Sequence, residues 1–218
     1  MEQLAKKTGK TYEMDMCSGP LFPKIVAFAV PLILSGILQL LFNAADIIVV
    51  GHFAGRESLA AVGSTTALIN LMINVFVGLS IGANVLVAQY SGAKKLKDLE
   101  ETVHTAMMIA LAGGFLLIFV GVFFSGPMLG LMGTPDDVLP LAALYLKIYF
   151  IGMPATLTYN FGAAILRAVG DTRRPLYFLL FAGAVNVVLN LVFVIVFSMG
   201  VAGVATATVV SECLSAVL

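Results

Sequence analysis

Asp46 is the residue of this sequence with the clearest chemical potential, because it is a carboxylic acid inside a long apolar segment. Inside a bilayer a carboxylate costs roughly 2.5–3.5 kcal/mol on insertion scales unless it is paired or protonated. At 100° per residue, Gln39, Asn43 and Asp46 fall on one helical face together with Ser35 and Gly36. No Lys or Arg lies at similar depth, so the pattern predicts a proton or cation site at Asp46. The alternative is a structural carboxylate that is hydrogen-bonded to Asn or Thr neighbours.

Four further apolar segments each carry polar residues on a single helical face. A single Asn, Ser or Thr is explained by hydrogen bonding between membrane helices, but so many polar faces together predict a polar cavity. We expect its substrate-facing wall to include Asn43, Asn70, Asn74, Tyr149 and Glu212, where Glu212 is either a second proton carrier or a residue nearer the inner mouth. The polar faces comprise Gly63, Thr66, Asn70, Asn74 and Asn84; Tyr145, Tyr149, Gly152, Thr156 and Tyr159; Asn186 and Asn190; and Thr208, Ser211, Glu212 and Ser215.

The composition indicates a membrane protein, since 60% of the 218 residues are hydrophobic and 11% are charged. Soluble domains carry about 25% charged residues. The zero net charge and the lack of a basic stripe argue against a nucleic-acid partner. Because lipid offers no partner for free backbone groups, apolar segments must cross the bilayer as helices. We therefore predict an all-α, polytopic membrane helix bundle of about six transmembrane helices, at residues 24–50, 58–90, 101–124, 138–166, 175–198 and 200–218.

The distribution of positive charge predicts the orientation of the chain. Ten of the twelve Lys and Arg residues lie in the N-terminal tail and in the second and fourth loops, and such loops are normally cytoplasmic. We expect a cytoplasmic tail at 1–20 and a six-helix lobe at 21–218 that is multi-pass in the plasma or inner membrane. The sixth segment reaches Leu218 without a cap or a flanking charge, so we expect truncation there, or else a half-size protein that pairs.

Pro31 lies inside the first apolar segment, where it removes a backbone hydrogen bond and is expected to bend the helix. The bend is either a moving hinge or a static kink, and membrane helices tolerate both. No cluster of His, Cys and carboxylates has metal-ligand spacing. No nucleophile elbow, P-loop or dinucleotide fingerprint is present, so we expect neither an enzyme nor a bound organic cofactor.

Several motifs, in order along the chain, resemble the multidrug and toxic compound extrusion (MATE) family of transporters. They are PLILSGILQLLFNAADIIVVG from Pro31, then GRESLAAVG, VGLSIGANVLVAQYSGAKK, ILRAVGDTRRP and GVAGVATATVVS. The resemblance covers nearly the whole chain after about residue 15. It implies that Asp46 is the family's first-helix acid, which is implicated in cation coupling, and that its polar partners are Gln39, Asn186, Asn190 and Thr208. Many members have an acid at the position of Asn190, so this sequence departs from a two-carboxylate site.

Family members usually have two six-helix lobes, so the resemblance implies that this chain is the first lobe, completed by a C-terminal lobe or by a second copy. The implied function is an antiporter that exports organic cations or drugs and is coupled to H⁺ or to Na⁺ at Asp46. One alternative is a lipid-linked oligosaccharide flippase of a related fold, which the lack of Lys and Arg on the polar faces argues against. Another is a membrane subunit that transports nothing by itself, and an intramembrane enzyme is the least favoured.

Overall fold

The computed structural model describes residues 20–218, and this part of the chain is helical with no strand. The expected tail at 1–20 therefore lies outside the described residues, apart from Pro20. The helices are α1 Leu21–Val49, α2 Gly55–Gly92, α3 Leu96–Leu131, α4 Leu139–Ile151, α5 Met153–Ala168, α6 Arg173–Leu191 and α7 Gly200–Val217, with two π-helices, η1 Val50–Ala54 and η2 Val192–Val196. The all-α prediction is confirmed, although α3 begins five residues earlier and ends seven residues later than expected.

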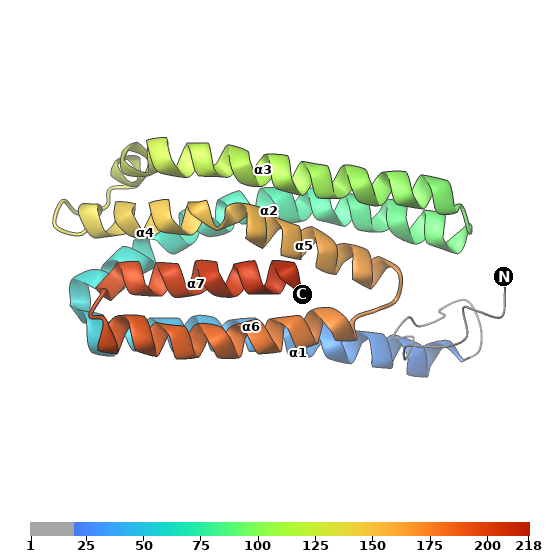
Figure 1. The fold of residues 1–218 in the computed structure, drawn as a ribbon, viewed down its shortest axis with the longest axis horizontal. Helices are drawn as coiled ribbons and strands as arrows, with labels where there is room; N and C mark the ends of the chain where they lie inside the picture. The colour runs from blue at the N-terminus through green and yellow to red at the C-terminus, as the bar shows by residue number, and fades with distance from the viewer. Residues whose placement is uncertain (1–19) are drawn as a thin grey trace.

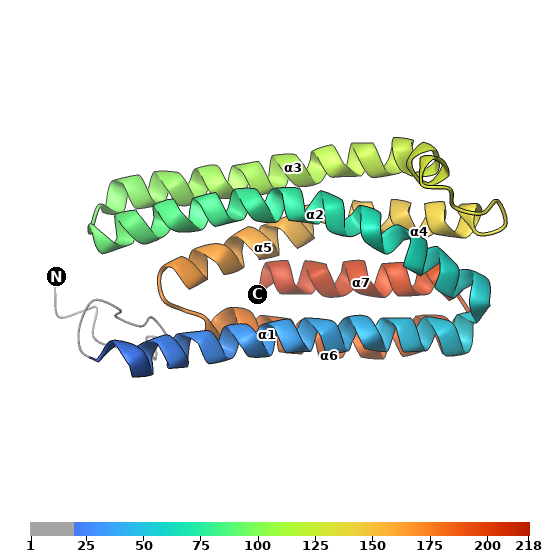
Figure 2. The ribbon, with the colours of Figure 1, turned by 180° about the vertical axis from the view of Figure 1, so that it is seen from behind.

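Four helical runs of the described residues are long and apolar enough to cross a membrane, or five if the bent pair α4 and α5 counts as one span. The first run, Leu21–Gly92, is continuous over 72 residues, but the chain turns back at η1, so α1 and α2 run in opposite directions (Figures 1 and 2). This run therefore supplies two crossings, and the bundle makes six passes. The chain is a multi-pass membrane protein.

The fourth pass is broken into α4 and α5, whereas the sequence predicted one helix at 138–166. The two helices meet at Gly152 with a bend of 52°. Pro154 explains the break, because it has no N–H to donate to the preceding turn and its ring clashes with the carbonyl there. Local bonds replace the missing one, with the Gly152 N–H donating to Tyr149 O at 3.0 Å. The prediction of one continuous helix at 138–166 was wrong, and Pro154 was the signal for the break.

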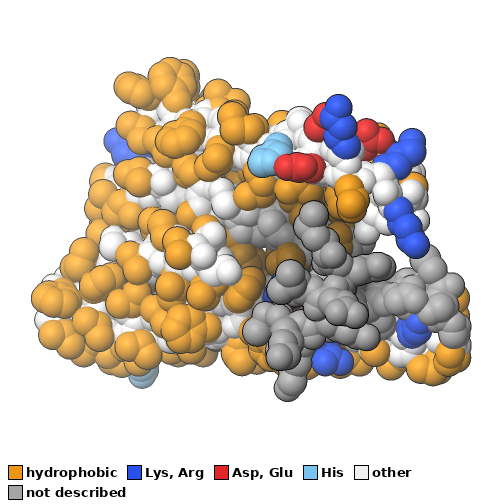
Figure 3. Space-filling model, turned by 45° about the vertical axis from the view of Figure 1, so that its right-hand side comes forward, with side chains coloured by type: hydrophobic (Ala, Val, Ile, Leu, Met, Phe, Trp, Pro, Cys, Tyr) orange, Lys and Arg blue, Asp and Glu red, His pale blue; other side chains and the backbone are white. Residues whose placement is uncertain are grey.

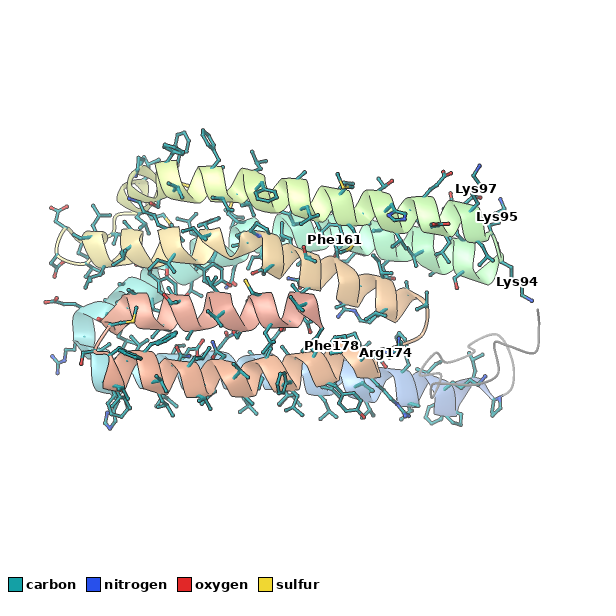
Figure 4. All side chains as sticks on the ribbon, viewed as in Figure 1. Lys94, Lys95, Lys97, Phe161, Arg174 and Phe178 are labelled. Carbon is teal, nitrogen blue, oxygen red and sulfur yellow. The ribbon has the colours of Figure 1, made fainter. Side chains whose placement is uncertain are left out.

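Positive charge gathers at one end of the bundle. Lys94, Lys95 and Lys97 lie at the turn between α2 and α3, and Arg174 lies at the start of α6 (Figure 4). We call this end, which also holds the start of α1, the basic end. Elsewhere hydrophobic side chains cover most of the visible surface, as Figure 3 shows, and many large apolar residues are exposed. A surface of this kind suits contact with lipid, while the cytoplasmic location of the basic end stays a prediction.

A buried acid, Asp171, fixes the start of α6 at the basic end. Its carboxylate is 1% exposed and accepts hydrogen bonds from the backbone N–H groups of Arg173 and Arg174, each at 3.1 Å. The other carboxylate oxygen lies 3.1 Å from Arg174 Nε. Backbone N–H groups in the first turn of a helix have no partner within the helix, so Asp171 satisfies two of them and holds the helix that carries Asn186 and Asn190.

Glycines allow α3 to approach its neighbours closely. A Cβ at Gly114 would stand 2.4 Å from the Cα of Pro154 in α5, and a Cβ at Gly121 would stand 2.2 Å from the Cβ of Phe150 in α4. Small residues at such contacts let membrane helices pack backbone to backbone, since lipid provides no hydrophobic force between helices. The glycines of α3 therefore hold the bent pair in place, and with it the wall that carries Tyr149 and Tyr159.

We predict that Gly114→Ala destabilises the bundle. Its methyl group meets main-chain atoms, which cannot swing away, so the free energy of unfolding should fall by about 1–3 kcal/mol. The matched control is Gly126→Ala on the same helix, where a Cβ meets no atom within 4 Å. Thermal unfolding of the detergent-purified variants measures the difference, and equal melting temperatures for both variants would show that the α3–α5 contact is loose.

Candidate functional site

A cavity of about 590 Å³ lies inside the bundle, lined by α1, α2, α4, α5, α6 and α7. This volume falls within the range of pockets for drug-sized molecules. The side chains contributed by α1 and α2 are exposed or partly buried, and those on the far wall are partly or fully buried. Of the candidate residues from the sequence, the wall includes Gln39, Asn43, Asp46, Asn70, Asn74, Tyr149, Asn186, Thr208 and Glu212.

Asp46 meets Asn190 across 144 residues of sequence. The Asn190 Nδ2 donates to Asp46 Oδ1 at 2.5 Å and also to Asn186 Oδ1 at 3.1 Å, and Asn190 is 1% exposed. Asn186 in turn donates to the Thr208 hydroxyl over a long 3.5 Å. In the described residues no Lys or Arg forms an ion pair with Asp46. The carboxylate is therefore held by a neutral amide that leaves its charge uncompensated.

Asn190 itself keeps an unused acceptor. Its Oδ1 atom is buried and has no hydrogen-bond partner among the described residues. Buried polar atoms without a partner are uncommon, and each calls for a physical explanation. A carbonyl oxygen next to a carboxylate can accept the O–H of a protonated acid or bind a small cation. The pair thus has the donors and acceptors for either ion.

The helices α1 and α6, which carry Asp46 and Asn190, both change into a π-helix a few residues beyond the pair. η1 begins four residues after Asp46, and η2 begins two residues after Asn190. π-helical turns inside α-helices are rare and are frequent at functional sites, because they shift the register of the following residues. The packing of η1 against η2 places both irregular segments at the end of the bundle opposite the basic end.

Other polar residues on the predicted faces serve helix packing. The Asn84 side chain donates to Ala164 O at 2.7 Å, which joins α2 to α5. Tyr145 is buried and stacks on Tyr149 with ring centroids 6.1 Å apart.

Pro31 is buried inside α1, which continues through it, and Ser35 Oγ donates to Pro31 O at 2.8 Å. The hinge role of Pro31 stays a prediction.

Arg167 is a cavity residue that the sequence analysis missed. It lies just beyond the helix expected at 138–166, but α5 extends to Ala168 and Arg167 lines the cavity. The spacing of Tyr159, Ala163 and Arg167, four residues apart, was the available signal, since it continues the polar face of the fourth segment by two further turns. All three residues line the cavity.

Comparison with known proteins agrees with this arrangement. The family model MatE matches residues 31–192. The chain is 32% identical over 200 residues to the "Probable multidrug resistance protein YpnP" of Bacillus subtilis (strain 168). The matched stretch covers 91% of this chain and 44% of that protein. It is similar to the structure titled "Reverse polarity of binding pocket suggests different function of a MOP superfamily transporter from Pyrococcus furiosus Vc1 (DSM3638)", with a TM-score of 0.87 and 26% identity over 97% of this chain and 46% of that one.

A further similar structure, "Crystal structure of MATE in the bent conformation", has a TM-score of 0.83 and 27% identity, and covers 89% of this chain and 43% of that chain. The chain therefore belongs to the MATE family of multidrug transporters. It spans about half the length of the relatives it matches. Membership of this family is in keeping with the helical bundle and its cavity.

We predict that Asn190→Ala destabilises the protein by about 1–3 kcal/mol, because Asp46 and Asn186 both lose a buried partner. Asn74→Ala is the matched control, since Asn74 lines the same cavity and has no hydrogen-bond partner in the described part of the chain. Thermal unfolding is the measurement. In the Asp46→Asn background the cost of Asn190→Ala should shrink, because the uncompensated acid is gone; an unchanged cost would mean that the Asp46–Asn190 bond contributes little.

Proposed function

We propose that this chain forms the ion-coupling lobe of an antiporter that exports organic cations in exchange for H⁺ or Na⁺. The ion is taken up at Asp46, with Asn190, Asn186, Thr208 and Gln39 as its polar surroundings, and the exported compound occupies the cavity beside it. The observation that carries the proposal is the Asp46–Asn190 contact, in which an acid without an ion pair meets a buried amide with a free acceptor.

The free-energy cost of keeping Asp46 ionised inside the bundle supports ion coupling. A carboxylate that has left water without a cationic partner is costly, and either a proton or Na⁺ removes that cost when it binds. An ion drives a conformational change only if its affinity differs between two states. Any movement of α1 relative to α6 separates Asp46 from Asn190, so the affinity for the ion changes with that movement. Pro31 in the same helix is a suitable place for α1 to bend.

The charge of the cavity favours cationic compounds. Two acids, Asp46 and Glu212, and one base, Arg167, are the charged residues on the described part of its wall. An oligosaccharide flippase has to hold a pyrophosphate, which needs an excess of Lys and Arg. Although Arg167 is a base that the sequence analysis had not placed there, acids still outnumber bases. The name of the Bacillus subtilis relative, a probable multidrug resistance protein, agrees with the export of drugs.

The orientation that we propose for the chain in the membrane follows from the positive charge at the basic end. We propose that the basic end is cytoplasmic, which places the N-terminus inside and Asp46 toward the outer face of the plasma or inner membrane. The chain then acts with a C-terminal lobe or with a second copy of itself, since the relatives it matches are about twice as long.

We predict that Asp46→Asn abolishes export while the variant still inserts and folds. The amide keeps the shape of the side chain but takes up neither a proton nor Na⁺, so the driving ion has no site. The assay is the efflux of a fluorescent organic cation from proteoliposomes, with a pH gradient and a Na⁺ gradient imposed separately. Dependence on only one of these gradients in the unmodified protein identifies the coupling ion.

The control is Asp137→Asn, the same chemical change at an exposed residue between α3 and α4, which should export at the normal rate. Thermal unfolding checks that both variants are intact. Normal export by the Asp46→Asn variant under both gradients would refute the role of Asp46, and export that depends on neither gradient would refute antiport.

A further inference from the structure

Glu212 is a second acid of the cavity, and it is separated from Asp46. Asn190 and Asn186 are one helical turn apart on α6, Asn186 contacts Thr208 on α7, and Glu212 follows Thr208 by one turn. At 1.5 Å per residue these two turns place Glu212 about 12 Å nearer the basic end than Asn190. The two acids therefore occupy different levels of one cavity.

The carboxylate of Glu212 has no hydrogen bond and no ion pair with any of residues 20–218. The Asp46 carboxylate, in contrast, accepts a hydrogen bond from Asn190. Arg167 lines the same cavity but forms no ion pair with this carboxylate among the described residues. A partly buried acid without a partner is expensive to keep ionised, so a cationic group that enters the cavity gains more free energy here than at a satisfied acid.

Aromatic side chains share the cavity with this acid. Tyr149 and Tyr159 both line it together with Glu212. The Tyr159 hydroxyl donates to Pro175 O at 3.1 Å, which fixes its ring. A carboxylate beside the rings of tyrosines is a well-suited environment for an organic cation, because the faces of the rings also attract positive charge.

We propose that Glu212, with Tyr149 and Tyr159, binds the positively charged group of the transported compound, while Asp46 binds the coupling ion. This division rests on the proposed function and adds a second site to it. The two sites are joined by the polar chain from Asn190 through Asn186 to Thr208, so occupancy of one is transmitted to the other through the positions of α6 and α7. A compound and an ion then need not compete for the same carboxylate.

The test is binding of rhodamine 6G, an aromatic dye whose positive charge does not depend on pH, measured by fluorescence polarisation on the detergent-purified protein. Glu212→Gln should weaken dye binding by at least about tenfold, since the dye loses the carboxylate that balances its positive charge. Glu212→Asp should recover part of the affinity. Asp46→Asn should change dye affinity much less than Glu212→Gln does, and it should abolish transport. Glu57→Gln, the same change at an exposed residue at the start of α2, should change neither.

Each other outcome identifies what has failed. Normal dye affinity in Glu212→Gln would overturn this inference and leave the role of Asp46 standing if Asp46→Asn still abolishes export. Equal losses of dye binding in both variants would overturn the division between the two acids. Recovery of dye binding when Arg167→Gln is added to Glu212→Gln would show that Glu212 only balances Arg167. A protein that neither binds nor exports the dye would overturn both proposals.

Discussion

The hydrogen bond between Asp46 and Asn190 is the interaction on which the rest of the site depends. It places an acid inside an apolar bundle without a cation, and it joins α1 to α6 at the level where both helices change into π-helices. An ion pair at this point would neutralise the acid and make it inert. A neutral amide holds the side chain in position and leaves its charge free to respond to a proton or to Na⁺. Under the proposed function, this contact between two helices is the one that responds to the ion.

The surrounding fold is arranged so that this contact can change. The helices α3, α4 and α5 are held together by glycines that bring backbones into contact, such as Gly114 against Pro154. The helix α1 lies at the open side of the cavity, with exposed polar residues on its inner face, and packs against α6. One part of the bundle is thus closely packed, and the helix that carries Asp46 has fewer neighbours to constrain it. Conformational change is cheapest in elements with few packed contacts.

The sequence predicted the membrane bundle and the face of α1 that carries Asp46, because helical periodicity and apolar length are local properties. It did not predict the break at Gly152, although Pro154 signalled it, because apolar length dominated the interpretation. It also ended the fourth helix at residue 166, one residue before Arg167, whereas α5 extends to Ala168. Periodicity also cannot distinguish Asn84, which bonds to a neighbouring helix, from Asn70 and Asn74, which line the cavity, because that outcome depends on which helix lies opposite.

The neutral side chain of Asn190 gains a physical meaning from the presence of Glu212 in the same cavity as Asp46. Two carboxylates in direct contact repel each other, so one of them is held protonated and the pair acts as a single ion site. Here the second acid lies about two helical turns away, beyond direct contact, and a neutral amide stands beside the first. The chain keeps two acids in one cavity without coupling their protons directly. Each acid can then be occupied by a different cation. An exchanger needs this arrangement if the ion and the compound are to influence each other through the positions of the helices. With one shared carboxylate they would compete for it instead.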